Sequence, residues 1–257
     1  MNDSITGVAI MNKYEIVPLV LSNITVEKSN MMYLTGCGIK VTLPVVSFYI
    51  RGASQNILID TGASAEFIRR YDPNQPVENV QSLVEALAKQ GLKPEDIDII
   101  IQTHLHHDHI GNTAKCTNAK VIVQDSELSF ALNPHPLFAG LYPQEVIREI
   151  TFEPVKGDIE VADGIRLILT PGHSPGTQSV AVETANGTAI ITGFCCIGET
   201  FNVSLETQRV LPAWQVYAPG CHTDALAAFD NALKVKKLAK ILIPNHEPTL
   251  RDTKTIP

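Results

Sequence analysis

The stretch Thr103-His104-Leu105-His106-His107-Asp108-His109-Ile110-Gly111 carries four of the eight histidines of the chain, and one aspartate, within six residues. It directly follows the apolar run 97–101, which predicts a buried strand. Unliganded, each of these polar rings at the end of a buried strand would need a hydrogen-bond partner. Imidazole and carboxylate together suit zinc, or a related divalent metal such as iron or manganese. The cluster therefore predicts a metal site.

The spacing within the cluster indicates how such a site is built. In an extended segment alternate side chains share a face, so His104 and His106 point the same way and can bind one ion. A tight turn after His106 would bring Asp108 and His109 toward a second ion. The side chain of His107 points to the opposite face of the extended segment from those of His104 and His106. This places His107 behind the ligands or on a pocket wall. The pattern differs from the helical HExxH arrangement and predicts a loop-borne site at a strand end.

Composition excludes several classes of function. A chain of 257 residues with 44% hydrophobic residues suits a single domain over 1–257, and a net charge of −7 argues against a nucleic-acid partner. The five cysteines are odd in number and lack CxxC spacing, which favours a reducing compartment. Residues 1–10 do not read as a signal peptide, and no apolar run reaches spanning length. We expect a cytoplasmic protein with a small-molecule substrate and no membrane partner, and leave a homodimer open.

Alternating strand and helix patterns predict a layered α/β domain. We expect strands over 41–50, 56–59, 97–101, 120–123, 165–169, 178–183, 188–192 and 241–243, and helices over 77–90, 125–132 and 224–238. Residues 194–220 are expected to be irregular.

Two further strand ends carry a histidine. One is Thr170-Pro171-Gly172-His173-Ser174-Pro175-Gly176, and the other is Pro244-Asn245-His246-Glu247. Active groups in layered sheets gather at strand ends, so His173 and His246 are predicted to converge with the first cluster.

With these motifs the chain resembles the metallo-β-lactamase superfamily, whose HxHxDH motif matches His104, His106, Asp108 and His109. Within it, the chain most resembles the N-acyl homoserine lactonase branch. The phrases that carry this likeness are 56–62 (NILIDTG), 103–106 (THLH), 121–124 (VIVQ) and 170–176 (TPGHSPG). The resemblance implies an αββα sandwich, with two mixed β-sheets flanked by helices and a two-metal site between strand ends.

The resemblance also implies a ligand set. A first metal would be held by His104, His106 and His173, and a second by Asp108, His109 and His246. Asp60 matches an aspartate at a strand end that orients a ligand histidine, although a simple turn or cap residue would look the same.

One segment departs from the family pattern. Phe194 stands where a metal-bridging aspartate is expected, and Ile197 where the lactonase branch has a tyrosine that contacts the substrate. Without the bridge, the second metal should bind more weakly or be absent. Cys195 or Cys196 could serve as a thiolate ligand, or both could be small buried hydrophobic residues.

The predicted function is that of a metal-dependent hydrolase, in which a metal-bound hydroxide opens a lactone or other ester. Asp108 would pass a proton to the leaving alkoxide. Two alternatives stay open at this point. One is a hydrolase of another carbonyl substrate, a thioester or an amide, and the other is a non-catalytic metal-binding protein that has lost the bridging aspartate.

Overall fold

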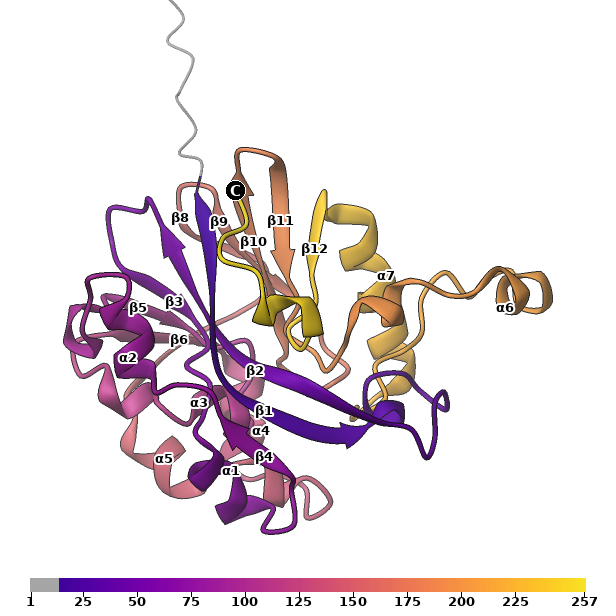
Figure 1. The fold of residues 1–257 in the computed structure, drawn as a ribbon, viewed down its shortest axis with the longest axis horizontal. Helices are drawn as coiled ribbons and strands as arrows, with labels where there is room; N and C mark the ends of the chain where they lie inside the picture. Colours follow the sequence, from indigo (N-terminus) through magenta and orange to yellow (C-terminus); the bar gives the residue numbers. More distant parts are fainter. Residues whose placement is uncertain (1–13) are drawn as a thin grey trace, which may run out of the picture.

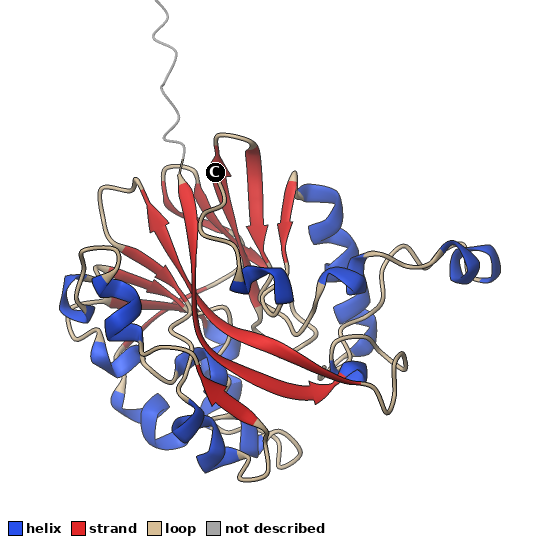
Figure 2. Cartoon of the chain, in the orientation of Figure 1, coloured by secondary structure: helices blue, strands red, loops and turns tan. Residues whose placement is uncertain are grey.

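The structure is a computed structural model that describes residues 14–257. Two β-sheets lie face to face, with helices on their outer faces (Figures 1 and 2). The αββα architecture expected from the sequence is therefore confirmed. The sequence interpretation of residues 1–10 lies outside the described residues.

The first sheet has seven strands in the order β4-β1-β2-β3-β5-β6-β7. Their bounds are β1 Glu15–Glu27, β2 Lys40–Arg51, β3 Ile57–Ile59, β4 Val77–Asn79, β5 Ile99–Ile101, β6 Lys120–Gln124 and β7 Phe152–Val155. Strands β3, β5, β6 and β7 are parallel to their neighbours in that order. The carboxyl ends of β3 and β5 therefore meet at one edge, which places Asp60 beside the histidine cluster.

The second sheet has five strands in the order β12-β11-β10-β9-β8. Their bounds are β8 Ile159–Ala162, β9 Ile165–Leu169, β10 Gln178–Thr184, β11 Gly187–Ile191 and β12 Ile241–Ile243. β12 runs parallel to β11, so the segment after β11 and the loop that carries His246 leave the sheet at the same edge. Between the two sheets lies a core of β-branched and aromatic side chains, among them Ile16, Phe48, Ile59, Val180 and Ile191.

Seven α-helices are found in residues 14–257. They are α1 Ala65–Tyr71, α2 Leu83–Ala88, α3 His107–Ile110, α4 Asp125–Leu132, α5 Gln144–Glu149, α6 Leu205–Val210 and α7 Ala225–Leu238. Helix α2 buries Leu83 and Leu87 against the outer face of the first sheet, and α7 buries Ala232 and Val235 against the second. Among the described residues, no helix is both long enough and apolar enough to cross a membrane.

Two predicted elements were wrong in part. The expected helix 77–90 begins only at Leu83, because Ser82 and Glu85 form a capping box there, while Val77 pairs with Ile24 as part of β4. Residues 194–220 are not wholly irregular, because Ser204 caps α6, which lies on a segment that projects from the body of the molecule (Figure 1).

Candidate metal centre

The six predicted ligands come together in two groups of three. Within each group the ligand atoms all lie within 4.8 Å of one another. The first group is His104, His106 and His173, and the second is Asp108, His109 and His246. The two groups are neighbours, since the rings of His104 and His109 are 4.0 Å apart. The loops that follow β5, β9 and β12 thus bring their ligand side chains together.

Local geometry at the end of β5 separates the two groups. His106 is the last extended residue, with φ −70° and ψ 155°, and α3 begins at His107. This single helical turn takes the place of the expected tight turn. It brings Asp108 and His109 together with His246, while the ring of His109 stays beside that of His104. Thr61 holds the turn by donating both its backbone N–H and its hydroxyl to the carbonyl of His109.

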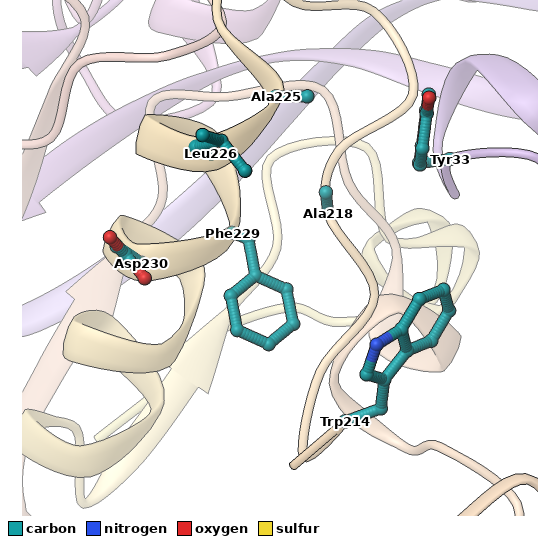
Figure 3. Close-up of a pocket in the computed structure, with 7 residues that line it drawn as sticks. All are labelled: Tyr33, Trp214, Ala218, Ala225, Leu226, Phe229 and Asp230. Atoms are coloured by element: carbon teal, nitrogen blue, oxygen red, sulfur yellow. The ribbon is translucent and has the colours of Figure 1, made fainter. Parts of the chain in front are cut away.

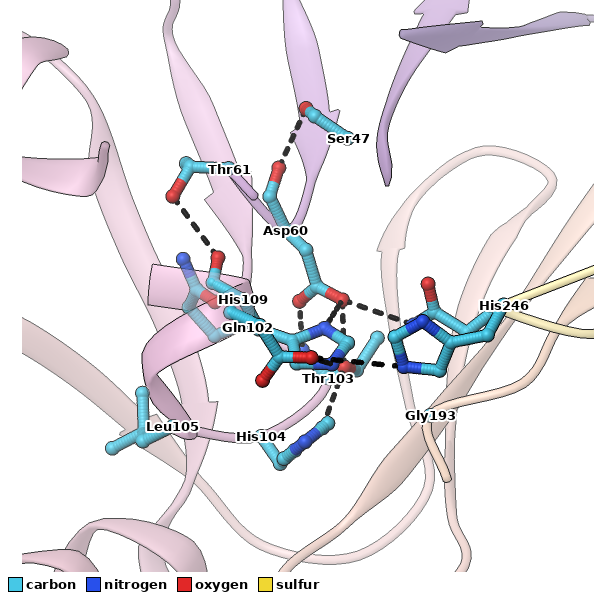
Figure 4. Close-up of polar contacts among 12 residues, drawn as sticks. Ser47, Asp60, Thr61, Gln102, Thr103, His104, Leu105, His109, Gly193 and His246 are labelled. Atoms are coloured by element: carbon cyan, nitrogen blue, oxygen red, sulfur yellow. Dashed lines mark hydrogen bonds and ion pairs between the residues drawn. The ribbon is translucent and has the colours of Figure 1, made fainter. Parts of the chain in front are cut away.

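Asp60 orients the ligand histidines through hydrogen bonds. Its carboxylate accepts hydrogen bonds from Nδ1 of His109 at 2.7 Å, from the backbone and hydroxyl of Thr103 at 2.7 and 2.8 Å, and from Asn245 at 3.2 Å (Figure 4). Because the Thr103 hydroxyl donates to Asp60, it accepts from Nδ1 of His104, 3.0 Å away. Asp60 is fully buried and has a positive φ of 54°. Its contacts are those of an orienting residue rather than of a simple cap.

The remaining anchors are backbone carbonyls. Nδ1 of His173 lies 2.7 Å from the carbonyl of Cys221, and Nδ1 of His246 lies 3.0 Å from that of Pro44. A neutral histidine ring that donates a hydrogen bond through Nδ1 has a free lone pair on Nε2, which can bind a metal ion. The Nε2 atoms of His104 and His173 are 3.2 Å apart, so they face the same point.

The pKa values of the ligand side chains differ between the two groups. Burial, helped by neighbouring rings, holds the pKa of His104 and of His106 well below the usual range, so both rings are neutral. Burial opposes charge on His109 as well, but the carboxylates of Asp108 and Asp60 outweigh it and raise the pKa of His109 to about 10. Burial likewise opposes the ionised form of Asp108, yet His109 holds the pKa of that carboxyl well below its usual range. Burial opposes charge on His173 too, but its contacts with Cys221 outweigh that effect and raise the pKa of His173. In the metal-free chain His104 and His106 are therefore neutral, whereas His109 carries a proton.

The ligands open into a cleft of about 330 Å³. Its lining includes the ligands His106, Asp108, His173 and His246, the side chains Tyr71, His107, Cys195 and Cys221, and the apolar residues Ile24, Val26, Met31, Leu137 and Leu141. His107 stacks on Tyr71 with ring centroids 5.5 Å apart and an interplanar angle of 6°. The opposite phase of His107 therefore places it on the cleft wall.

Residues 41–238 match the sequence profile of the metallo-beta-lactamase superfamily. The chain belongs to this superfamily. It is 31% identical over 164 residues to the N-acyl homoserine lactonase of Bacillus thuringiensis, a match that covers 59% of this chain and 63% of the relative. It is 25% identical over 241 residues to the N-acyl homoserine lactonase AttM of Rhizobium radiobacter, covering 85% of this chain and 88% of the relative.

A solved structure shows the same likeness. The AiiA protein of B. thuringiensis, in a variant with N-decanoyl-L-homoserine bound at its active site, superposes with a TM-score of 0.73 at 26% identity. That match covers 94% of this chain and 96% of the other. The resemblance to the lactonase branch is thus confirmed. The match to the B. thuringiensis sequences spans less than two thirds of their length.

The segment that follows β11 holds Phe194 and Ile197, at the positions where the resemblance implied a bridging aspartate and a tyrosine. Phe194 and Cys196 are buried in a hydrophobic cluster with Phe201 and α7, while Ile197 is buried in another, against Met31. None of these three lines the metal cleft. Cys195 does line it. The interpretation of Cys196 as a buried hydrophobic residue therefore fits. Cys195 is only partly buried; it packs against the cluster that holds Ile197 and also lines the cleft.

Two residues of the site escaped the sequence analysis. The first is Cys221, which lies in the cleft next to Cys195 and His173. These two neighbours lower the pKa of Cys221 well below its usual range, and Cys221 in turn raises the pKa of Cys195. A lone cysteine in a loop gives no signal in the sequence that would separate it from a surface residue.

The second is Glu127 of α4, which is fully buried. Its carboxylate accepts hydrogen bonds from the backbone N–H of Leu105 at 3.0 Å, from the hydroxyl of Tyr142 at 3.2 Å, and from Ser174. Burial raises the pKa of Glu127. Glu127 thus ties the loop of His104 and His106 to the loop of His173. A glutamate in the first turn of a helix is common, so its sequence position does not reveal this role.

A separate apolar pocket of about 380 Å³ lies between α7 and residues 214–218 (Figure 3). Phe229 and Leu226 of α7 form one side, and Trp214 and Tyr33 form the other. Met31, two residues before Tyr33, lines the metal cleft instead. The segment 31–33 therefore contributes to both hollows.

Proposed function

We propose that this protein is a metal-dependent hydrolase that opens a lactone, with N-acyl homoserine lactones as its substrates. The observation that carries the proposal is the pair of adjacent three-ligand groups at the floor of one cleft. The lactonases to which the chain is similar support the choice of substrate. Apolar residues on the cleft wall, such as Met31 and Leu141, suit a substrate that carries a hydrocarbon chain.

The donor set fits two divalent ions, and we propose zinc. Neutral imidazoles and one carboxylate are borderline ligands that suit zinc better than magnesium or calcium. Four of the five ligand histidines are fixed through Nδ1, which leaves Nε2 free to coordinate. Bound metal would supply Lewis acidity and a water of lowered pKa.

The residues of the chain would then bind the substrate and transfer a proton during hydrolysis. Nδ1 of His107 is buried and has no hydrogen-bond partner among residues 14–257, so it can bond to a polar group of the substrate. Asp108 is 13% exposed and ionised, with Oδ2 3.4 Å from Nε2 of His109 and 3.8 Å from Nε2 of His246. From that position its carboxylate can take up a proton and return it to the leaving alkoxide.

The test is turnover of N-acyl homoserine lactones by the zinc-loaded chain, compared with His104→Ala. We expect hydrolysis in the wild type and background rates in the variant, because His104 lies at the centre of the first group. His135→Ala is a matched control, since His135 is exposed and lies outside both groups. Equal rates for wild type and His104→Ala would rule out the proposed mechanism.

A second candidate differs only in the substrate, which would be a thioester or an amide. It is favoured by the burial of Ile197, because no tyrosine hydroxyl reaches the substrate from that position. A kinetic panel of lactone, thioester and amide separates the two candidates. Preference for the lactone in kcat/KM supports the first, and comparable or higher rates on the other acyl compounds support the second.

A further inference from the structure

Residues 202–215 form an arm that carries α6 away from the body of the molecule (Figure 1). Helix α6 buries none of its own residues. Its apolar side chains are left in solvent, since Leu205 is 74% exposed and Val210 is 76% exposed. An isolated helix shorter than about 12 residues is only marginally stable in water. The exposed apolar side chains of this six-residue helix therefore indicate that it packs against a partner.

The root of the arm is tied to the body of the molecule. The ammonium group of Lys236, on α7, donates to the carbonyl of Phe201 at 2.6 Å and to that of Gln215 at 2.7 Å. Beside them, the backbone N–H of Tyr217 donates to the carbonyl of Thr200 at 2.8 Å. The two ends of the arm are thus joined to each other and to α7, whereas α6 itself remains exposed.

The apolar pocket between α7 and residues 214–218 lies beside this root (Figure 3). Trp214, near the end of the arm, forms part of its wall, and Leu226 lies on its rim with 80% of its surface exposed. Asp230 is the one charged residue among the described residues that line it. No residue of 202–213, all of which the structure describes, lines the pocket. Helix α6 therefore leaves the pocket of its own chain open.

The arm and the pocket carry complementary side chains at equal spacing. On α6, Leu205 and Arg209 are four residues apart, so they lie on one face of the helix, and both are exposed. On α7, Leu226 and Asp230 are also four residues apart and exposed. An apolar side chain and a cation on one helix thus match an apolar side chain and an anion on the other. Both pairs can form at once when the two helices lie side by side.

We propose that this protein forms a two-fold symmetric dimer in which α6 of each copy docks against the apolar pocket of the other. Leu205 would pack on Leu226 of the partner subunit, and Arg209 would pair with Asp230 of the partner subunit. A second copy is favoured over an unrelated protein because one chain carries both complementary surfaces, and a two-fold exchange covers both at the same time. The inference goes beyond the proposed function, since it involves neither metal nor substrate.

The test is the mass of the full chain in solution, measured by sedimentation velocity over a range of protein concentrations. We expect the wild type to sediment with twice the mass of one chain. Arg209→Asp and Asp230→Arg each place like charges opposite each other, so each should raise the dissociation constant of the dimer by about tenfold or more. The double variant Arg209→Asp/Asp230→Arg restores opposite charges and should restore the dimer. Leu226→Asp should dissociate it.

A matched control separates docking from a general effect of surface charge. Val84→Asp adds a charge at an exposed apolar residue of α2, outside the arm and the pocket, and should leave the dimer intact. Far-ultraviolet circular dichroism shows that each variant is folded. A wild type that remains a monomer at every concentration, or a dimer that both single charge reversals leave unchanged, would overturn the proposal. A double variant as dissociated as the single variants would refute the pairing of Arg209 with Asp230.

Discussion

The buried carboxylate of Asp60 lies 2.7 Å from Nδ1 of His109, a ring that belongs to the second ligand group. The same carboxylate holds Thr103, whose hydroxyl accepts from His104 in the first group. One side chain at the end of β3 therefore orients a ligand in each group. This arrangement explains why a charged residue is kept at a strained positive φ in the interior.

Replacing Asp60 with Asn should weaken metal binding more than it weakens the fold. The amide cannot accept all the hydrogen bonds that the carboxylate accepts, so His109 loses its fixed orientation. Loss of such an orienting contact costs about 10- to 100-fold in metal affinity. Competition with a chelator of known affinity measures this change. Asp252→Asn, at an exposed position, is the control, and an unchanged dissociation constant in Asp60→Asn would show that Asp60 has no orienting role.

Binding of the second ion should release a proton from His109. Its pKa in the metal-free chain is about 10, so the ring is charged at neutral pH, and only a neutral ring can coordinate. Apparent affinity for this ion should therefore rise about tenfold per pH unit up to about pH 10. The raised pKa also stabilises the metal-free fold. This contribution is fully present below pH 6.5, the ordinary value, and is lost as pH rises through about 10.

Calorimetry in two buffers of different ionisation enthalpy counts the released protons. The first ion should release no proton from His104 or His106, which are already neutral, and at most one from His173, whose pKa is raised because its contacts with Cys221 outweigh burial. Absence of proton release on binding of the second ion would contradict the assignment of the charge to His109.

The sequence predicted the parts of the site that depend on local spacing. His104, His106, Asp108 and His109 lie within six residues, and His173 and His246 each follow a strand. Parallel pairing brings Asp60 after β3 beside the cluster after β5, and brings His246 after β12 beside the segment after β11, whereas His173 lies in the loop between the antiparallel strands β9 and β10. The beginning of α2 was misplaced because Val77 is as suitable for β4 as for a helix. Tertiary pairing with β1 decides between the two.

The sequence could not show which residue of 194–197 lines the cleft. The direction of Cys195 is set by contacts from distant parts of the chain, namely Gln178 against Gly193 and Asn245 against Thr192. Glu127 and Cys221 were missed for the same reason. Each acts on a loop 20 or more residues away, since Glu127 bonds to Leu105 across 22 residues and Cys221 bonds to His173 across 48.

Glu127→Gln should loosen the connection between the two ligand loops. The carboxylate accepts from Leu105, Tyr142 and Ser174, whereas an amide would turn a donor toward at least one of them. An unsatisfied buried group costs about 1–3 kcal/mol, so we expect a lower free energy of unfolding by that amount. Chemical denaturation of the metal-free chain measures it. Glu206→Gln, on the exposed face of α6, should be neutral, and a Glu127→Gln chain as stable as the wild type would contradict the role given to Glu127.

His107→Phe should impair substrate binding and leave the metals in place. Phenylalanine preserves the stack on Tyr71 but removes Nδ1, a buried atom without a hydrogen-bond partner among the described residues, which we propose bonds to the substrate. A lost hydrogen bond is worth about 0.5–1.5 kcal/mol, which corresponds to a rise in KM of about two- to tenfold with a smaller change in kcat. Steady-state kinetics and metal analysis are done on the same preparations. Tyr71→Phe keeps the stack and the Nδ1 atom and should leave KM near the wild-type value. A fall in metal content in His107→Phe, with KM unchanged, would instead assign His107 to the support of its neighbour Asp108.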